Sequence, residues 1–304
     1  MKKIILIVLA VLLVGLIVGA VVLGGSGSDV ETPNNDAVVE NNEATTVEEE
    51  EEEVKEPVFP EETLDLEGGT YVLTFFDDFD GDDIDPTKWE RCPEQKRPAG
   101  YYWDDDMITV EDGNLVITTA VSEETGRPIA GGIRTKGLFE QSGGYFEIKC
   151  TVQDIPGYWS AFWLMCDEQL FVDGYCDGTA KDGAEIDIFE ACHYETKKVN
   201  QNIHFDGYGN KHQQLPNVML NTHVYDGEYH TFALLWTKDA YIFFIDGKEV
   251  YRLQEGDGKY PGFCEPEMYL KISAEIGTWA GSIKKDQLPD SWKVDYVRVY
   301  QLSE

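Results

Sequence analysis

Basic residues are scarce in this sequence of 304 residues. Lysine and arginine together number 24, against 58 aspartates and glutamates, and the formal net charge is −34. A chain with such an excess of negative charge is repelled by phosphate backbones and by anionic lipid headgroups. We therefore expect no nucleic-acid partner and no binding to an anionic membrane surface.

The sequence also lacks the signatures of several protein classes. Its six cysteines include no CxxC pair and no cysteine–histidine cluster, so a zinc site is not expected. A disulfide between Cys166 and Cys176 would close a short loop, whereas Cys150 and Cys192 are typical of buried thiols. No unit of about 20–50 residues repeats, and long helical windows are few. The segment 68–304 is long enough for one large all-β domain.

The first 67 residues divide into two segments of opposite character. After Lys2 and Lys3, an unbroken apolar run from Ile4 to Leu23 spans 20 residues, enough for a helix to cross a bilayer. We predict that residues 1–23 are an N-terminal signal anchor, with a cleaved signal peptide as the alternative. Residues 24–67 are predicted to be an acidic low-complexity linker, because 29–67 hold 16 acidic residues and one basic residue. The remainder would then be extracellular, anchored to the cell membrane or secreted.

The stretch Gly183–Ala191 sets three carboxylates among large apolar residues. Its isoleucines and phenylalanine favour a strand, on which Glu185 and Asp187 share a face. Glu190 would face the other way on a regular strand, so we predict a β-bulge at Ile188-Phe189 that returns it to the acidic face. Carboxyls this close cannot all ionise freely, and at least one pKa should be raised. One ionised and one protonated carboxyl are what glycoside hydrolysis requires; a solvated acidic edge or a metal site is the alternative.

The rest of the segment 68–304 alternates short apolar stretches with turns. Strands are expected, among others, at 71–76, 107–110, 115–119, 144–150, 159–165, 230–237 and 292–300. Many short strands without obvious helices predict a sandwich of two antiparallel sheets.

Together these residues resemble family 16 of the glycoside hydrolases, the clan of laminarinases and lichenases. The resemblance covers nearly all of 68–304, and its motifs occur in the family's order. The most specific motif is Glu185–Glu190; others are Phe76–Gly81 with Trp89, Glu111–Leu115, Gly157–Trp163 and Asp295–Tyr300. The resemblance implies a concanavalin A-like β-jelly roll, with the acidic strand lining a cleft on the concave sheet.

The resemblance also implies roles for the three acids. Glu185 would be the nucleophile and Glu190 the acid/base, while Asp187 would bond to the nucleophile and tune both pKa values. The reaction would retain anomeric configuration through a glycosyl-enzyme and would need no cofactor.

Sugar sites need aromatic faces and polar groups that fix hydroxyls. The substrate-binding residues expected from the family's pattern are Trp159, Trp163, Arg134, Asn202, His204, Trp279, Tyr101 and Trp103. Core packing is the alternative for Trp159, Trp163 and Trp279, and a structural role is the alternative for His204. Arg134 follows two glycines where the family commonly has a polar neighbour, which leaves its role open.

Many members of the family bind a structural calcium ion on the convex side. The matching positions are the backbone carbonyls of Asp78 and Gly113 and the carboxylate of Asp295, and oxygen ligands suit calcium. A salt bridge or a turn contact is the alternative for Asp295.

The expected function is that of a cell-surface endo-β-glucanase acting on β-1,3 or mixed β-1,3/1,4 glucans. The first alternative is a galactan hydrolase of the agarase, porphyranase or carrageenase kind. Its substrates are often sulfated and call for arginine and lysine in the cleft, which the acidic composition disfavours. A non-catalytic carbohydrate-binding module and a transglycosylase also remain open. The polysaccharide is the expected partner, the membrane contact is confined to the N-terminal apolar run, and the catalytic domain is expected to be monomeric.

Overall fold

The computed structural model describes residues 60–303, apart from 94–95, 98–99, 193–196 and 257. The predicted signal anchor, 1–23, and most of the predicted linker lie outside the described residues. Within the described part of the chain, no helix is long and apolar enough to cross a membrane.

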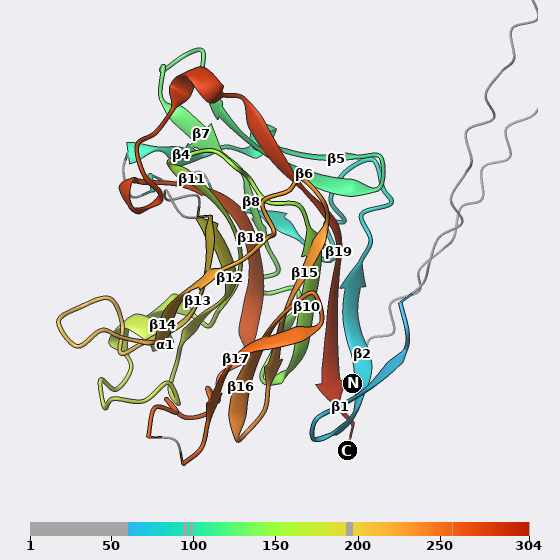
Figure 1. Cartoon of the computed structure of the whole chain (residues 1–304), viewed down its shortest axis with the longest axis vertical. Coiled ribbons are helices and arrows are strands. Elements are labelled where there is room, and N and C mark those ends of the chain that lie inside the picture. The colour runs from blue at the N-terminus through green and yellow to red at the C-terminus, as the bar shows by residue number, and fades with distance from the viewer. Residues whose placement is uncertain (1–59, 94–95, 98–99, 193–196, 257, 304) are drawn as a thin grey trace, which may run out of the picture. The chain divides into compact units, whose positions relative to one another are not determined.

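The first of two sheets follows the strand order β17-β16-β15-β10-β19-β6-β7-β4, with β2 beside β19, β1 beside β2 and β5 beside β6 (Figure 1). Its strands are β1 (Thr63–Leu66), β2 (Gly69–Asp77), β4 (Tyr102–Trp103), β5 (Ile108–Glu111), β6 (Asn114–Val121), β7 (Pro128–Ala130), β10 (Gly144–Cys150), β15 (His230–Trp236), β16 (Ala240–Ile245), β17 (Lys248–Gln254) and β19 (Asp290–Leu302). The pairing is antiparallel except between β4 and β7.

The second sheet has the order β14-β13-β12-β11-β18-β8-β3, with β9 also beside β18. Its strands are β3 (Glu90–Arg91), β8 (Gly132–Arg134), β9 (Glu140–Gln141), β11 (Tyr158–Met165), β12 (Glu185–Cys192), β13 (Lys198–Phe205), β14 (Gln213–Asn221) and β18 (Met268–Ile276). The one α-helix of the described residues is α1 (Glu168–Asp173), and short 3-10 turns cover Asp105–Met107, Thr278–Ala280 and Lys285–Gln287.

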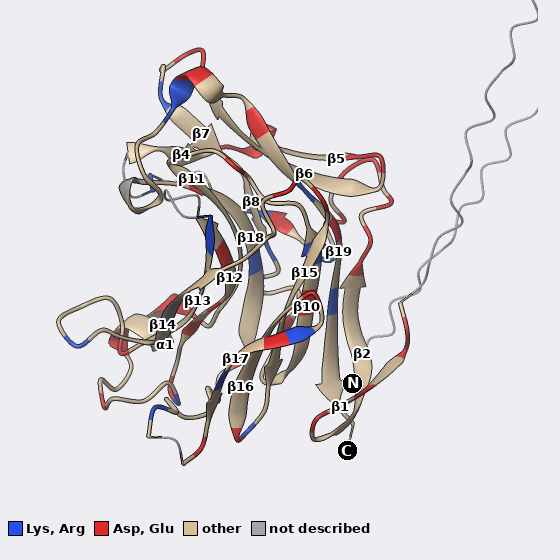
Figure 2. Ribbon diagram, viewed as in Figure 1, with Lys and Arg blue, Asp and Glu red and all other residues tan. Residues whose placement is uncertain are grey.

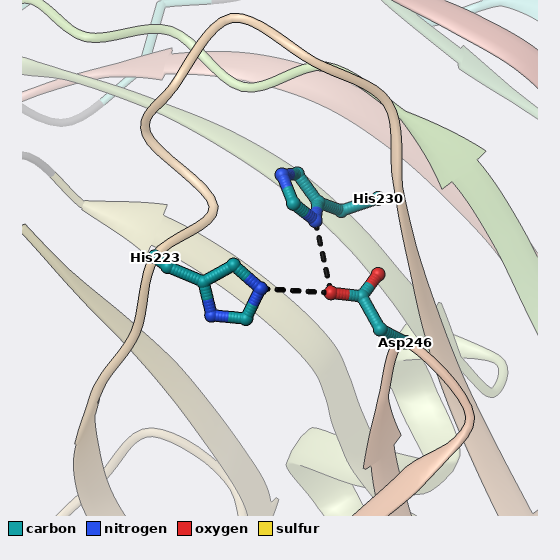
Figure 3. A group of neighbouring side chains, drawn as sticks. All are labelled: His223, His230 and Asp246. Carbon is teal, nitrogen blue, oxygen red and sulfur yellow. Dashed lines mark hydrogen bonds and ion pairs between the residues drawn. The ribbon is translucent and has the colours of Figure 1, made fainter.

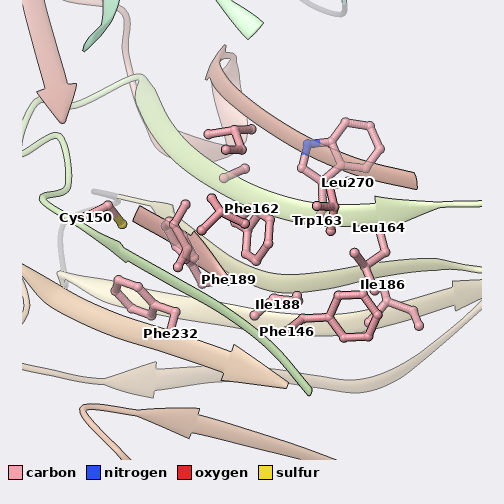
Figure 4. Close-up of a cluster of buried hydrophobic side chains, with 14 of the residues drawn as sticks. Phe146, Cys150, Phe162, Trp163, Leu164, Ile186, Ile188, Phe189, Phe232 and Leu270 are labelled. Carbon is pink, nitrogen blue, oxygen red and sulfur yellow. The ribbon is translucent and has the colours of Figure 1, made fainter. Parts of the chain in front are cut away.

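Large apolar side chains fill the space between the sheets (Figure 4). Phe189 of β12 stacks on Phe232 of β15 with ring centroids 4.0 Å apart, and Trp292 of β19 meets Phe189 edge-on. Burying each such ring stabilises the fold by about 1.5–3 kcal/mol. Charged residues lie mostly in turns and at strand ends (Figure 2). The predicted all-β sandwich of two antiparallel sheets, a jelly roll, is confirmed.

Two details differ from the sequence-based expectations. The linker was expected to run to residue 67, but Thr63–Leu66 already form β1, which pairs with β2. The cause is the alternation in this strand, because Leu64 and Leu66 pack against a small apolar cluster on the first sheet. Cys166 and Cys176 form no disulfide, and both are free thiols.

Candidate active site

The acidic strand is β12, and it carries the predicted bulge. Phe189 pairs with Phe162 of β11, yet Asp187 pairs with the very next residue, Trp163, so Ile188 is extra. The extra residue resets the alternation. As a result Glu185, Asp187 and Glu190 line one groove, whereas Ile186 and Phe189 point into the core.

A buried glutamine supports the bulge. Gln201 of β13 lies opposite the bulged pair, and its side-chain amide donates to the carbonyl oxygen of Ile188 over 3.1 Å. This bond satisfies a backbone acceptor that the irregular ladder leaves without its usual partner. Sequence reasoning missed Gln201. The available signal was a polar side chain at an alternate position that Val199, Ile203 and Phe205 otherwise fill with apolar residues.

Each acid has a polar neighbour. Asn200 donates its side-chain N–H to Glu190 Oε2 over 2.8 Å, and the Tyr208 hydroxyl donates to Glu185. His204 Nε2 lies 3.2 Å from Asp187 Oδ2. The predicted residue His204 therefore contacts an acid of the groove directly. Asn202, also predicted, is buried. Its side-chain amide nitrogen lies 3.0 Å from His204 Nε2, the ring nitrogen that also faces Asp187, and donates to Gln214 over 3.1 Å.

The acids influence one another's protonation. Burial, followed by the charge of Asp187, raises the pKa of Glu185 to about 7. The same two causes raise the pKa of Glu190 well above its usual value. Burial works against a charged His204, but the hydrogen bond and charge of Asp187 outweigh it and raise the pKa of His204 to about 9. At neutral pH the site thus holds an imidazolium and at least one protonated glutamate.

The groove has a volume of about 500 Å³, and three of the predicted aromatic residues stand in its wall: Trp159, Trp163 and Tyr101. The indole N–H of Trp163 donates to the Ser273 hydroxyl over 3.2 Å, which fixes its ring. Trp279 is 40% exposed and packs edge-on against Trp159, with centroids 4.8 Å apart. It extends the aromatic surface beyond the groove wall.

Two predicted substrate contacts lie away from the groove wall, and the structure corrects one of them, Trp103. Trp103 is buried beneath the groove, because the guanidinium of Arg97 lies 4.0 Å above its ring. Arg134 pairs with Lys271 across β18 and β8, outside the residues that line the described groove, and its Nε lies 2.6 Å from Glu90. Its contact with substrate stays a prediction.

Strand β18 contributes residues that sequence reasoning missed. The ammonium of Lys271 lies 3.8 Å from the ring centre of Trp163 and 5.0 Å from that of Trp103. Strand pairing sets Asp187, Trp163 and Lys271 in one row across three adjacent strands. The alternation of polar Lys271, Ser273 and Glu275 with apolar residues in Met268–Ile276 was a readable signal of a groove-facing strand.

Glu275 is neutralised inside the groove. Arg97 Nη2 lies 3.3 Å from Glu275 Oε1, the Tyr101 hydroxyl donates to Glu275, and Ser273 donates to it over 3.0 Å. Lys271 has no such carboxylate partner in an ion pair among the described residues. The groove therefore contains a buried lysine without a direct ion pair among the described residues. Burial lowers the pKa of Lys271, and the charges of Glu275 and Glu185 act in the opposite direction.

The positions expected to hold calcium lie close together in the first sheet. Strand pairing sets Val297 opposite Asp77 and Val294 opposite Leu115, so Asp295 falls between the end of β2 and the β5–β6 turn that contains Gly113. However, Asp295 pairs with Lys149 at 2.7 Å, and the Asp78 side chain faces Arg298 at 3.5 Å. Lys149 would have to move away before a cation could bind Asp295.

The sequence profile described as Glycosyl hydrolases family 16 matches residues 96–298, about two thirds of the chain. This chain belongs to that family. It is therefore a glycoside hydrolase, and catalysis in this family needs no cofactor.

Relatives of known structure or name agree with this assignment. A β-glucanase of Rhodothermus marinus is 25% identical over 254 residues, which cover 76% of this chain and 86% of the relative. A keratan-sulfate endo-1,4-β-galactosidase of Sphingobacterium multivorum is 25% identical over 245 residues, 75% of this chain and 56% of the relative. The crystal structure of a non-specific endo-β-1,3(4)-glucanase of family GH16 matches with a TM-score of 0.64 and 26% identity, over 77% of this chain and 92% of that one.

Proposed function

We propose that this protein is a retaining endo-β-glucanase that cuts β-1,3 or mixed β-1,3/1,4 glucans. The observation that carries the proposal is the bulge of β12, which gathers Glu185, Asp187 and Glu190 onto one wall of an aromatic-lined groove. The name of the Rhodothermus relative, a β-glucanase, and that of the matched crystal structure, an endo-β-1,3(4)-glucanase, support the choice of glucan.

In the first step Glu190 donates its proton to the glycosidic oxygen. Its raised pKa keeps a proton available at neutral pH. Glu185, in its ionised form, attacks the anomeric carbon as the glycosidic bond breaks and forms a glycosyl-enzyme. The leaving sugar departs as an alcohol.

In the second step Glu190, now a carboxylate, takes a proton from a water molecule. The resulting oxygen nucleophile attacks the anomeric carbon and releases Glu185, so two inversions give net retention. Asp187, paired with the imidazolium of His204, keeps negative charge between the two glutamates and so raises both their pKa values. Trp159 and Trp163 provide faces for the C–H groups of the sugar rings.

The proposal is tested by a polysaccharide panel with product analysis. The full chain, purified in mild detergent, is incubated with laminarin, lichenan, barley glucan, agarose, porphyran and keratan sulfate. We expect short oligosaccharides from the three glucans. NMR should show that their new reducing ends are first released as the β-anomer. Release of the α-anomer first, or no cleavage of any glucan, would contradict it.

A second candidate is a hydrolase of anionic galactans, and Lys271 favours it. This ammonium is buried, lines the groove and lies in the same row as Asp187. A buried ammonium without a direct ion pair among the described residues suits a sulfate or carboxylate on the neighbouring sugar. The relative that acts on keratan sulfate, by its name, adds support.

Replacing Lys271 by methionine distinguishes the two candidates. For an anionic substrate, the charge-assisted contact is worth about 1.5–3 kcal/mol, so kcat/KM falls about 10–100-fold. For a neutral glucan no such contact is lost, so kcat/KM should change less than about threefold at a pH well above the pKa of Glu185. At lower pH the loss should be larger, because the charge of Lys271 lowers that pKa. Lys293→Met, on the exposed face of β19 in the other sheet, is the matched control.

We further propose that residues 1–23 hold the enzyme at the outer face of the cell membrane and that the acidic segment serves as a stalk. Surface biotinylation of intact cells tests this, with labelling of the full-length chain expected.

A structural calcium ion at Asp78, Gly113 and Asp295 is also proposed, with Lys149 as its competitor. Calcium should then raise the melting temperature of Lys149→Met more than that of the parent protein, and no shift in either would exclude the site.

A further inference from the structure

Two histidines and an aspartate converge in the first sheet where β15 begins and β16 ends, apart from the residues that line the groove (Figure 3). His223 lies in the connection between β14 and β15, His230 is the first residue of β15, and Asp246 opens the turn between β16 and β17. Both imidazoles point toward one carboxylate oxygen of Asp246 (Figure 3).

The spacing of these atoms matches that of ligands around one metal ion. His230 Nδ1 lies 2.9 Å from Asp246 Oδ2, and His223 Nε2 lies 3.2 Å from the same oxygen. One ligand atom from each residue lies within 4.8 Å of the others. Ligands about 2.0–2.1 Å from a tetrahedral zinc ion are separated from each other by about 3.3 Å, so only small side-chain movements would admit the ion.

The supporting contacts are those that a metal site needs. His230 Nε2 lies 3.0 Å from Asp226 Oδ1, so the outer ring nitrogen can donate to a carboxylate while Nδ1 faces inward. This carboxylate–histidine pairing fixes the ring and its tautomer in many metal sites. The second oxygen of Asp246, Oδ1, accepts the backbone N–H of Thr231 over 3.0 Å. Two of the three ligands are thus held in place before any ion binds.

We propose that His223, His230 and Asp246 bind one divalent transition-metal ion, with Zn²⁺ as the reference ion and water in the remaining position. Imidazole nitrogens select zinc, cobalt, nickel or copper over calcium and magnesium. The absence of cysteine motifs argued against zinc, but that argument covers only sites built on thiolates. The ion joins the connection after β14, a strand of the grooved sheet, to the β16–β17 turn of the other sheet. It therefore stabilises the fold and takes no part in glycoside cleavage.

The experiment is a zinc titration of the full chain, treated with EDTA and freed of chelator. Calorimetry should give one saturable site per chain, and the melting temperature should rise with zinc concentration because the ion binds the folded state. His223→Ala removes an exposed ligand without disturbing the core, and we expect at least about a hundredfold loss of zinc affinity. Asp226→Ala should weaken binding about 10–100-fold, the effect usual for a partner of a ligating histidine.

His212→Ala is the matched control, because His212 is an exposed histidine that pairs with His204 instead. Its zinc affinity should equal that of the parent protein. Cobalt(II) should give visible absorption in the parent and in His212→Ala but lose most of its intensity in His223→Ala. Absence of a saturable site would overturn the proposal. Equal zinc affinity in His223→Ala and the parent would also overturn it, since the ion would then bind elsewhere, for example at Glu185, Asp187 and His204.

Discussion

Two clusters of imidazole and carboxylate groups lie in the described part of the chain, and their surroundings differ. In the groove, His204 contacts Asp187 on one side and the exposed His212 on the other, and burial raises the pKa values of Glu185 and Glu190. Where β15 begins and β16 ends, two imidazoles meet one oxygen of Asp246, and His223 is largely exposed. Three carboxyls crowded into one groove hold protons, whereas two imidazoles that converge on one carboxylate oxygen offer nitrogen lone pairs. The same residue types therefore suit acid/base chemistry in one place and metal binding in the other.

Removing the nucleophile should have the largest effect, because turnover depends on the groove cluster and does not depend on the cluster of His223, His230 and Asp246. Glu185→Ala should lower kcat about 10⁴-fold or more, because no other group can form the glycosyl-enzyme. Added azide should restore turnover and give a glycosyl azide of inverted configuration, since it enters the space left by the carboxylate. His223→Ala should keep the parent rate. Unchanged turnover in Glu185→Ala would remove its assigned role.

Glu190→Gln should have the next largest effect. For a polysaccharide, whose leaving group is a poor one, kcat should fall about 10²–10⁴-fold because protonation is lost. Aryl glycosides with acidic phenols need no such help in the first step, so that step should be nearly unaffected in rapid-mixing measurements. Equal losses for all leaving groups in that step would count against Glu190 as the acid.

The pH profile of kcat/KM should reflect the raised pKa values. Glu185 must be ionised, and its pKa is raised to about 7, so activity should fall about tenfold for each pH unit below 7. Glu190 must be protonated, and its raised pKa sets the loss of activity on the alkaline side. The acidic and alkaline limbs of the profile give apparent pKa values that belong to the coupled pair of glutamates and not to either residue alone. A profile that stays flat down to pH 5 would show that Glu185 is not perturbed in this way.

The smallest expected effect is on thermal stability. The folded state holds the Glu185 proton up to about pH 7, while the unfolded chain releases it near 4.5, so stability falls as pH rises across that interval. Glu185→Gln mimics the protonated form and should raise the melting temperature at pH 8, by about 2–4 °C for each kcal/mol gained. The gain should vanish at pH 4.

Glu168 provides the opposite case for comparison. Its burial favours the neutral form, but hydrogen bonds from Lys136 and Tyr269 outweigh this and lower its pKa to about 2. Stability from this group is present above about pH 4.5 and lost as pH falls toward 2. Glu168→Gln should therefore lower the melting temperature at pH 8. A gain in this variant, or a loss in Glu185→Gln, would contradict the assigned charge states.

The sequence was sufficient to predict the parts of the site that depend on local alternation. The positions of Glu185, Asp187 and Glu190 follow from strand periodicity and one extra residue. Trp163 was expected only from the family resemblance, and the antiparallel pairing of β11 with β12 is what places it beside Asp187. Arg97 was not predictable, because it lies in an irregular segment and meets Glu275 178 residues away. The burial of Trp103 depends on that same long-range contact.

The account rests most directly on which carboxyl becomes bonded to the sugar. The measurement is mass spectrometry of peptides after reaction with a 2-deoxy-2-fluoro glycoside that carries a dinitrophenyl leaving group, built on the oligosaccharide that the panel identifies. The fluorine slows release of the intermediate, so the label should be found on Glu185 in stoichiometric amount. A label on Asp187 or Glu190, or turnover of the sugar with none of these residues labelled, would contradict the proposed mechanism.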